Sequence, residues 1–420
     1  MTAEQQLPEG WEYVPFNMFF NVVSISDKKI SQKEYLDNGK YPVIDQGNLF
    51  IGGYSNDESL ILKISSPVIV FGDHTKCFKY VSFPFVAGAD GIKVFEPQNG
   101  IYPKYAYYYC LSIDLTDRGY SRHFAFLKKC QFLIVPIETQ QAIVNKIESL
   151  FDEIDEGIGR LKTAAQQIQQ YRQSLLKNAF NGELTKEWRS KHADTLPSEN
   201  ELIAQIQTTR EQHHAQQLAD WQNITIGEVV TISPKKEKAI DDDTDVSFSS
   251  MHLMSSSLSE HLTYEIKKWA DVKKGFTVFR NNDVLLAKIT PCFENGKSAV
   301  AQDLINGIGT GSTEFMVLRC SNQILPKFLY FLVNTPEFRQ AGIHNMTGSV
   351  GHKRVPKDFV STWAFSLPPL AEQTEIVAIL ESKLTACDQL ADELAKQLKQ
   401  AELLKQAVLK AAFSGSLLDK

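Results

Sequence analysis

The stretch that decides the fold is PIETQQAIVNKIESLFDEIDEGIGRLKTAAQQIQQYRQSLLKNAFNGEL, residues 136–184, because the chain contains it twice. A shift of 233 positions aligns it with residues 369–417 without a gap, and 16 of the 49 pairs are identical. Surface loops tolerate insertions, whereas a helix with a partner of fixed length does not. The repeat therefore indicates a duplicated structural element.

Each copy has the pattern of a long helix with one apolar face. Apolar residues recur at steps of three and four, and the outer positions carry mostly Lys, Gln, Asp and Glu. Proline precedes each copy, glycine follows it at Gly182 and Gly415, and no proline interrupts it. We predict two helices of about 40 residues, each roughly 60 Å long, that pair as a coiled coil. A helix that lies on the core of its own domain is the alternative.

The predicted seam uses one line of apolar residues from each copy, and the same line is the predicted interface to any partner helices. In the first copy the seam contains Ile143, Ile147, Ile154, Leu161, Ile168, Tyr171 and Leu175. In the second copy it contains Ile376, Leu380, Cys387, Leu390, Leu394, Leu398, Ala401, Leu404 and Val408.

Two segments of a different character accompany the helices. Residues 1–135 and 221–366 both have short apolar runs broken by turn residues, such as Val68–Phe71 in the first and Val284–Lys288 in the second. The predicted class is therefore α+β, with globular domains at 1–135 and 221–366, repeat helices at 136–185 and 367–420, and a helical connector at 186–220. The two globular segments share little sequence, which indicates two different ligands.

Composition leaves the class of ligand open. The net charge of −6 disfavours a polyanion, because phosphate binding favours an excess of Lys and Arg. The excess negative charge belongs to the helical segments, however, while the globular segments sum to zero, which remains compatible with DNA. No apolar run reaches membrane-spanning length, and Met1–Gly10 lacks a secretion signal. We therefore predict a cytoplasmic protein with no membrane association and with reduced cysteines.

No catalytic arrangement is recognisable. Asn295–Ser298 resembles the end of a phosphate-binding loop, but Pro291 occupies the position of the required glycine. The tetrapeptides of amino methyltransferases are missing, and neither His74 nor His352 has an identifiable catalytic partner. The chain is predicted to be no enzyme, to bind no metal and to need no cofactor of its own.

Basic residues do gather beside predicted turns, where they suit phosphate oxygens. Each one alone is as well explained as an ordinary solvated side chain, so only their collective placement points to binding. The candidate DNA-binding residues are Lys76, Lys79, Arg122, His123, Lys128, Lys288, Lys297, His352, Lys353 and Arg354.

Four kinds of segment resemble the specificity subunit of bacterial type I restriction-modification systems, in an order and spacing that cover essentially the whole chain. They are Leu7–Trp11, Tyr41–Gly47, Leu367–Gln373 (LPPLAEQ), and the Lys-x-Ala-Phe-x-Gly-x-Leu endings at 177–184 and 410–417. One departure is Val135–Gln140 (VPIETQ), a degenerate version of the proline-rich signature that Leu367–Gln373 carries intact. It affects expected partner contacts and leaves the architecture unchanged.

The resemblance implies a function for each part. Each globular segment would be a target recognition domain that reads one half of a bipartite site in double-stranded DNA, and the repeated helices would form an antiparallel coiled coil that sets the spacing. Two methyltransferase subunits and two restriction (translocase) subunits would complete the complex, and S-adenosylmethionine, ATP and magnesium would belong to them. The alternative function is a coiled-coil adaptor whose globular domains bind protein or carbohydrate.

Overall fold

The computed structural model describes residues 10–88, 91–115, 122–192, 221–235, 240–258, 261–349, 351–415 and 417. The chain divides into two units that each contain one globular part and half of each repeat helix. Unit 1 consists of residues 1–162 and 396–420, and unit 2 of residues 163–395. Of the predicted connector, Lys186–His192 forms helix α5, and residues 193–220 lie outside the described residues.

The two repeats form helices of equal length, α4 (Ile137–Phe180) and α11 (Leu370–Phe413), with 44 residues each. In unit 1, Lys405 in α11 pairs with Asp155 in α4 at 2.6 Å. In unit 2, Arg172 in α4 pairs with Asp388 in α11. These are the same two repeat positions, because the 233-residue shift carries Asp155 to Asp388 and Arg172 to Lys405.

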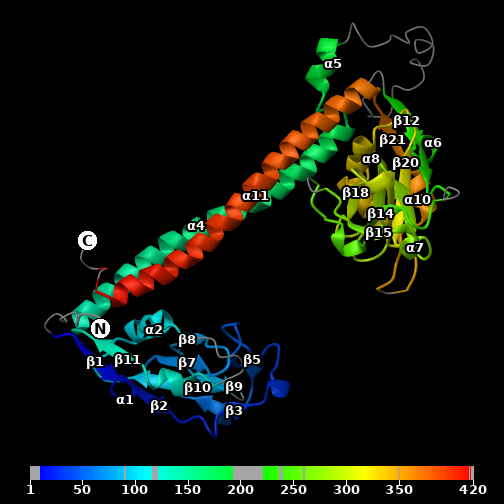
Figure 1. Ribbon diagram of the computed structural model, residues 1–420. Helices are drawn as coiled ribbons and strands as arrows, with labels where there is room; N and C mark the ends of the chain where they lie inside the picture. Colours follow the sequence, from blue (N-terminus) through cyan, green and yellow to red (C-terminus); the bar gives the residue numbers. More distant parts are fainter. Residues whose placement is uncertain are drawn as a thin grey trace. The chain divides into compact units, whose positions relative to one another are not determined.

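The direction of the helices follows from contacts inside each unit. In unit 2, Glu372 at the start of α11 contacts Thr185, which lies just beyond the end of α4. In unit 1, the last turns of α11 share one apolar cluster with the first turns of α4. The helices therefore lie alongside each other and run antiparallel within each unit, as predicted (Figure 1).

Most of the predicted seam is packed. Ile143, Ile147, Leu175, Ile376, Leu380, Cys387 and Val408 are buried, and Ile154, Leu161, Ile168, Leu394, Leu398 and Ala401 are half-buried.

Three seam positions were wrong, because Leu404 (51% exposed), Leu390 (56%) and Tyr171 (47%) face outward. Alternating steps of four and three from Cys387 lead to Ala391 and Lys405, each one residue beyond the leucine that the apolar pattern favoured.

The globular part of unit 1 contains two sheets. The first has the strand order β2-β10-β7-β8, and in the second β9 pairs with β3, β4 and β6 while β4 also pairs with β5. A short ribbon of β1 and β11 leads into α4. The strands are β1 Glu12–Pro15, β2 Phe20–Val23, β3 Lys29–Ile30, β4 Tyr41–Ile44, β5 Gly53–Ser55, β6 Ile61–Leu62, β7 Val68–Gly72, β8 Phe78–Val81, β9 Phe85–Gly88, β10 Ile92–Pro97 and β11 Gln131–Ile134, and the helices are α1 Phe16–Phe19, α2 Pro103–Ser112 and α3 Phe124–Leu127.

The globular part of unit 2 repeats this plan. Its first sheet has the order β13-β20-β17-β18, its second sheet the order β15-β14-β19-β16, and a ribbon of β12 and β21 leads into α11. The strands are β12 Gln222–Thr225, β13 Val230–Ile232, β14 Asp245–Ser249, β15 Glu265–Lys268, β16 Thr277–Arg280, β17 Asp283–Ala287, β18 Ser298–Val300, β19 Ile308–Gly311, β20 Phe315–Cys320 and β21 Ala364–Leu367, and the helices are α6 Ile226–Val229, α7 Trp269–Val272, α8 Pro326–Leu332, α9 Pro336–His344 and α10 Lys357–Thr362.

Each first sheet has two inner strands, and we call the more deeply buried one, β7 or β17, its central strand. All five residues of both strands are buried, which explains why each reads as a continuous apolar run rather than an alternating one. The two globular parts therefore share one architecture, although their sequences show little in common.

A buried glutamine attaches each globular part to its helix. In unit 1, the Gln140 Oε1 accepts a hydrogen bond from the Tyr102 N–H (2.7 Å), and its Nε2 donates to the carbonyls of Val135 (2.8 Å) and Gly100 (3.0 Å). Gln140 is the last residue of the degenerate signature at Val135–Gln140. That signature is therefore intact at the position that makes these contacts.

The repeat-related Gln373 forms the matching hydrogen bonds in unit 2. It accepts one from the Leu325 N–H (2.8 Å) and donates to the carbonyls of Pro368 (2.8 Å) and Gln323 (2.9 Å). Both units also have a lysine on the globular part that pairs with a glutamate on the helix, Lys104 with Glu148 and Lys327 with Glu381.

One of the departures from the signature is Thr139, which occupies the repeat position of Glu372. In unit 2, the fully buried Glu372 carboxylate accepts hydrogen bonds from the Thr185 hydroxyl (2.6 Å), the Trp221 Nε1–H (2.8 Å) and the Arg189 guanidinium. Thr139 cannot provide such a carboxylate. The start of α4 therefore lacks the carboxylate hydrogen bonds that Glu372 makes at the start of α11, whereas the glutamine contacts are the same in both units.

Candidate nucleic-acid interface

In unit 1, two loops that are distant in sequence meet where β7 ends. The backbone N–H groups of His123 and Phe124 donate to the Asp73 carbonyl (3.0 Å) and to Asp73 Oδ1 (2.7 Å). These bonds join the loop that contains Lys76 to the segment that contains Arg122. The structure thus brings together two groups of predicted binding residues.

Unit 2 joins the equivalent loops at the end of β17. The Val355 N–H donates to the Lys288 carbonyl (2.8 Å), and the Thr290 N–H donates to the Lys353 carbonyl (3.0 Å). The predicted residues Lys288 and Lys353 therefore lie on one end of the domain, on loops that follow the central strand and precede α10.

Two predicted binding residues are enclosed instead of exposed. Lys79 is 4% exposed, and its ammonium donates to the Leu49 carbonyl at 2.5 Å and lies 3.4 Å from Asp45 Oδ1. His123 is also buried, with Nδ1 3.0 Å from the Asp73 carbonyl. The prediction that these two side chains contact DNA phosphates is wrong, because a residue's place next to a turn does not reveal which way its side chain points.

The other eight candidate residues differ in their exposure and in the contacts that their side chains make within the domain. Lys288 and Lys297 are half-buried and donate to the carbonyls of Thr313 (2.9 Å) and Met251 (2.8 Å), so both help to fasten the loops. Lys128 lies over the Phe124 ring at 5.3 Å. Lys76 is half-buried, whereas Arg122, Lys128, His352, Lys353 and Arg354 are exposed.

Arg354 lies in the segment between α9 and α10, and Figure 1 shows part of this segment in orange. The Arg354 guanidinium donates to both carboxylate oxygens of Glu314, at 2.9 and 2.7 Å. The hydrogen bonds from Arg354 hold the pKa of the Glu314 carboxyl below its usual range. The carboxylate therefore stays charged at neutral pH and keeps the arginine in one orientation.

A buried arginine that sequence reasoning missed supports the loop after β17. Arg339 in α9 donates to the carbonyls of Phe293 and Gly296, both at 3.1 Å, and to Asn334 Oδ1 at 2.6 Å. Burial lowers its pKa to about 9. No local signal marks Arg339, because arginine on a short amphipathic helix ordinarily faces water.

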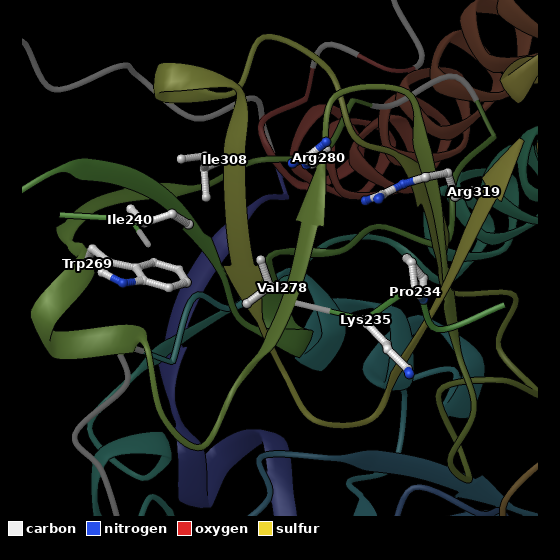
Figure 2. A pocket seen from close by; sticks show the side chains of 8 residues that line it. All are labelled: Pro234, Lys235, Ile240, Trp269, Val278, Arg280, Ile308 and Arg319. Carbon is white, nitrogen blue, oxygen red and sulfur yellow. The ribbon is translucent and has the colours of Figure 1, made fainter. Parts of the chain in front are cut away.

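Neither of two cavities in unit 2 coincides with these loops. A cavity of about 70 Å³ lies near the opposite end of β17, where Trp269, Arg280 and Arg319 are among the residues that line it (Figure 2). It is far below the size of ordinary ligand pockets. A second cavity of about 290 Å³ is lined by residues that include Lys327, Tyr330 and Glu381, at the junction with α11.

Within the described residues, no group of three or more His, Cys, Asp and Glu side chains is arranged to hold a metal ion. Among the same residues, no helix combines the length and the apolar character that crossing a membrane requires.

Comparison with known proteins agrees with the repeated design. The chain is 40% identical over 190 residues to the type I restriction enzyme EcoAI specificity subunit of Escherichia coli, a match that covers 45% of this chain and only 32% of that relative. The StySPI specificity subunit of Salmonella potsdam is 23% identical over 98% of this chain and 90% of its own length. A chain from a structural study of type I R-M assembly and conformational transition has the same fold, with a TM-score of 0.65, 16% identity and coverage of 98% and 99%.

The family match extends over most of the sequence, in two parts. Residues 8–162 and 219–400 both match the family described as the type I restriction modification DNA specificity domain. Each matched part contains one globular part and more than half of the helix that follows it. The chain therefore belongs to the type I restriction-modification DNA specificity family.

Proposed function

We propose that this chain is the non-catalytic specificity subunit of a type I restriction-modification complex, in which each globular part is a target recognition domain for one half of a bipartite DNA site. The observation that carries the proposal is the repetition of one architecture with different residues at the paired loops. The order of the first sheet, the glutamine attachment and the Lys–Glu pair are the same in both units. Two domains with the same architecture but different loop residues are suited to binding two different half-sites.

DNA is the ligand class that family membership favours over protein or carbohydrate, so the adaptor function is the weaker candidate. The loops offer basic side chains that reach solvent, Arg122 and Lys128 in unit 1 and His352 and Lys353 in unit 2. Side chains of this kind position a protein on the phosphate backbone, while sequence is read at base edges in the grooves.

The repeat also supports two copies of one kind of partner. Ile137 and Leu370 are repeat mates, and so are Tyr171 and Leu404; all four are exposed apolar side chains, from 37% to 51%. The same surface is thus presented once in each unit. We assign these surfaces to two methyltransferase subunits, and Leu404, which the coiled-coil seam excludes, belongs to this interface.

The remaining chemistry belongs to partners in this proposal. Two restriction (translocase) subunits complete the complex, and the partners bind S-adenosylmethionine, ATP and magnesium. This chain then needs no cofactor and works in the cytoplasm, where the DNA is.

The test is to express the chain together with its neighbouring methyltransferase subunit and to map modified bases in the host DNA. A split motif with a gap of constant length is the expected result. Unmodified DNA, despite a complex of normal composition, would contradict the proposal and favour the adaptor.

A further inference from the structure

We propose that Arg354 is a base-reading residue of the second recognition domain, specific for a guanine in the major groove, and that Glu314 is the positioning residue that orients it. This inference rests on the proposed function. It goes further by distinguishing one residue that selects sequence from neighbouring cations that contact phosphates.

The backbone of Arg354 is held on two sides. It forms isolated β-bridges with Ile289, in the loop after β17, and with Thr347. The Thr347 N–H donates to the Arg354 carbonyl at 3.0 Å, and the Arg354 N–H donates to the Thr347 carbonyl at 2.8 Å. A side chain that reads a base must be placed within a fraction of an ångström, which such a doubly paired backbone allows.

The turn between Thr347 and Arg354 requires glycine. Gly348 has φ +124°, and a Cβ at this position would lie 2.9 Å from the His352 carbonyl oxygen. The chain therefore folds back closely enough to pair Thr347 with Arg354, and it leaves His352 and Lys353 exposed beside the arginine.

The two ion-pair contacts leave one edge of the guanidinium for a ligand. Glu314 accepts from Nε (2.9 Å) and from Nη2 (2.7 Å), so the carboxylate occupies the Nε–Nη2 edge. The Nη1–Nη2 edge carries one proton of each nitrogen, while the second Nη1 proton points toward Cδ, and Nη1 also donates a long hydrogen bond to the His352 carbonyl at 3.3 Å. Two parallel N–H donors on this edge match the O6 and N7 acceptors of guanine.

Arg354 is more exposed than Glu314, as a base-reading residue and the residue that orients it should be. The Arg354 side chain is 46% exposed, whereas the Glu314 side chain is 22% exposed. The guanidinium can reach a ligand while the carboxylate stays behind it. Because the carboxylate restricts the orientation of Arg354, the arginine is better suited to one planar base edge than to a phosphate, which accepts hydrogen bonds from many directions.

Among the described residues, unit 1 shows no counterpart of this ion pair. Arg122 occupies the corresponding position before α3, but the residue before β10 is Gly91, where unit 2 has Glu314 before β20. Glycine offers no carboxylate to orient the arginine. The two domains therefore differ in the mechanism by which this position acts, as well as in the residues around it.

The experiment uses the full chain in complex with its methyltransferase subunit and compares modification motifs. Arg354→Ala is expected to lower the preference for guanine at one position of one half-site by on the order of 10- to 100-fold, with the other half-site unchanged. Arg354→Lys keeps the charge and loses the two-donor edge, so it should relax the same position. Glu314→Gln should relax it partly.

Lys353→Ala is the matched control. It removes an exposed cation from the neighbouring position, and it should weaken modification at all sites without changing the motif. If Arg354→Ala melts well below the wild type, Arg354→Lys decides the outcome.

The outcomes separate the two proposals. Wild-type complex without a bipartite motif would overturn the proposed function itself. A normal wild-type motif that Arg354→Lys leaves unchanged at every position would overturn base reading by Arg354 and reduce it to a phosphate contact.

Discussion

At the scale of single residues, one buried glutamine in each unit connects three backbone groups across the junction between recognition domain and helix. Gln140 and Gln373 are 1% and 0% exposed, and all their side-chain hydrogen bonds go to backbone atoms. Alanine at either position would leave those backbone groups buried without hydrogen-bond partners, and the unfolding free energy would fall by the cost of burying unpaired polar groups.

We expect Gln140→Ala to lower the free energy of unfolding by about 2 kcal/mol, since it strands the Tyr102 N–H and two carbonyls. Urea denaturation measures the change. The control is Gln141→Ala, an exposed neighbour on the same helix whose loss should change stability by less than about 0.5 kcal/mol. Equal effects of the two variants would contradict the role of Gln140.

Two thiols report on the two units separately. Burial raises the pKa of the Cys110 thiol in unit 1, and burial, with a smaller effect of Asp283, raises the pKa of Cys320 in unit 2 to about 12. The ordinary pKa of a cysteine thiol is 9.0, so the unfolded chain loses these protons at a lower pH than the folded chain does. Deprotonation therefore favours the unfolded chain, and stability should fall as the pH rises above about 9.

At pH 8.5 we expect both thiols to be alkylated far more slowly in the folded protein than in urea, because Cys110 is buried and the raised pKa of the half-buried Cys320 keeps its thiol protonated. Mass spectrometry after iodoacetamide treatment measures modification at each cysteine. Rapid alkylation of Cys110 in the native protein would contradict its burial.

At the scale of secondary-structure elements, the leucines of α11 differ in burial according to the face of the helix on which they lie. Leu404 and Leu409 belong to the same helix and unit, yet Leu404 is 51% exposed and Leu409 2% exposed. We expect Leu409→Ala to cost about 3 kcal/mol of unfolding free energy and Leu404→Ala less than about 0.5 kcal/mol. Thermal or urea unfolding distinguishes them, and a large cost at Leu404 in the isolated chain would contradict the seam.

The repeated ion pairs between the helices predict a coupling that a double-mutant cycle can measure. Asp155→Lys places two like charges together in unit 1, and adding Lys405→Asp restores opposite charges. The expected coupling is about 0.5 kcal/mol, because the pair is largely solvated. Glu153→Lys, at an exposed position two residues away, is the control and should show no coupling with Lys405→Asp.

At the scale of the whole molecule, we expect helix length to set the distance between half-sites. Insertion of one heptad after Lys162 in α4 and after Ala395 in α11, which are repeat mates, would lengthen both helices by about 10 Å while keeping the seam in register. The recognised spacer should grow by about three base pairs, or binding should be lost.

Mapping of modified bases with the methyltransferase subunit present gives the spacer length. A seven-residue insertion in the connector, between residues 193 and 220, is the matched control and should leave the spacer unchanged. If inserting a heptad into both α4 and α11 also leaves the spacer length unchanged, the two protein helices do not set the distance between the half-sites.

The sequence by itself determined the parts that depend on neighbours along the chain. Helical periodicity repeats every three or four residues, so the two helices, their pairing and most of the seam were predictable from residues 136–184 and 369–417. Family membership was also recognisable from short segments such as Leu367–Gln373. The local pattern could not decide whether Leu404 or Lys405 lies at the seam, because a step of three from Ala401 leads to Leu404 and a step of four leads to Lys405.

Only the tertiary structure decided the contents of the candidate site. The first sheets of the two globular parts share one strand order without visible sequence similarity, because many different apolar residues can fill the same buried strands. The enclosure of Lys79 and the pairing of Arg354 with Glu314 involve residues 30 and 40 positions apart. Contacts at such separations depend on how strands and loops are brought together in space, and this information is not carried by the few residues around each position.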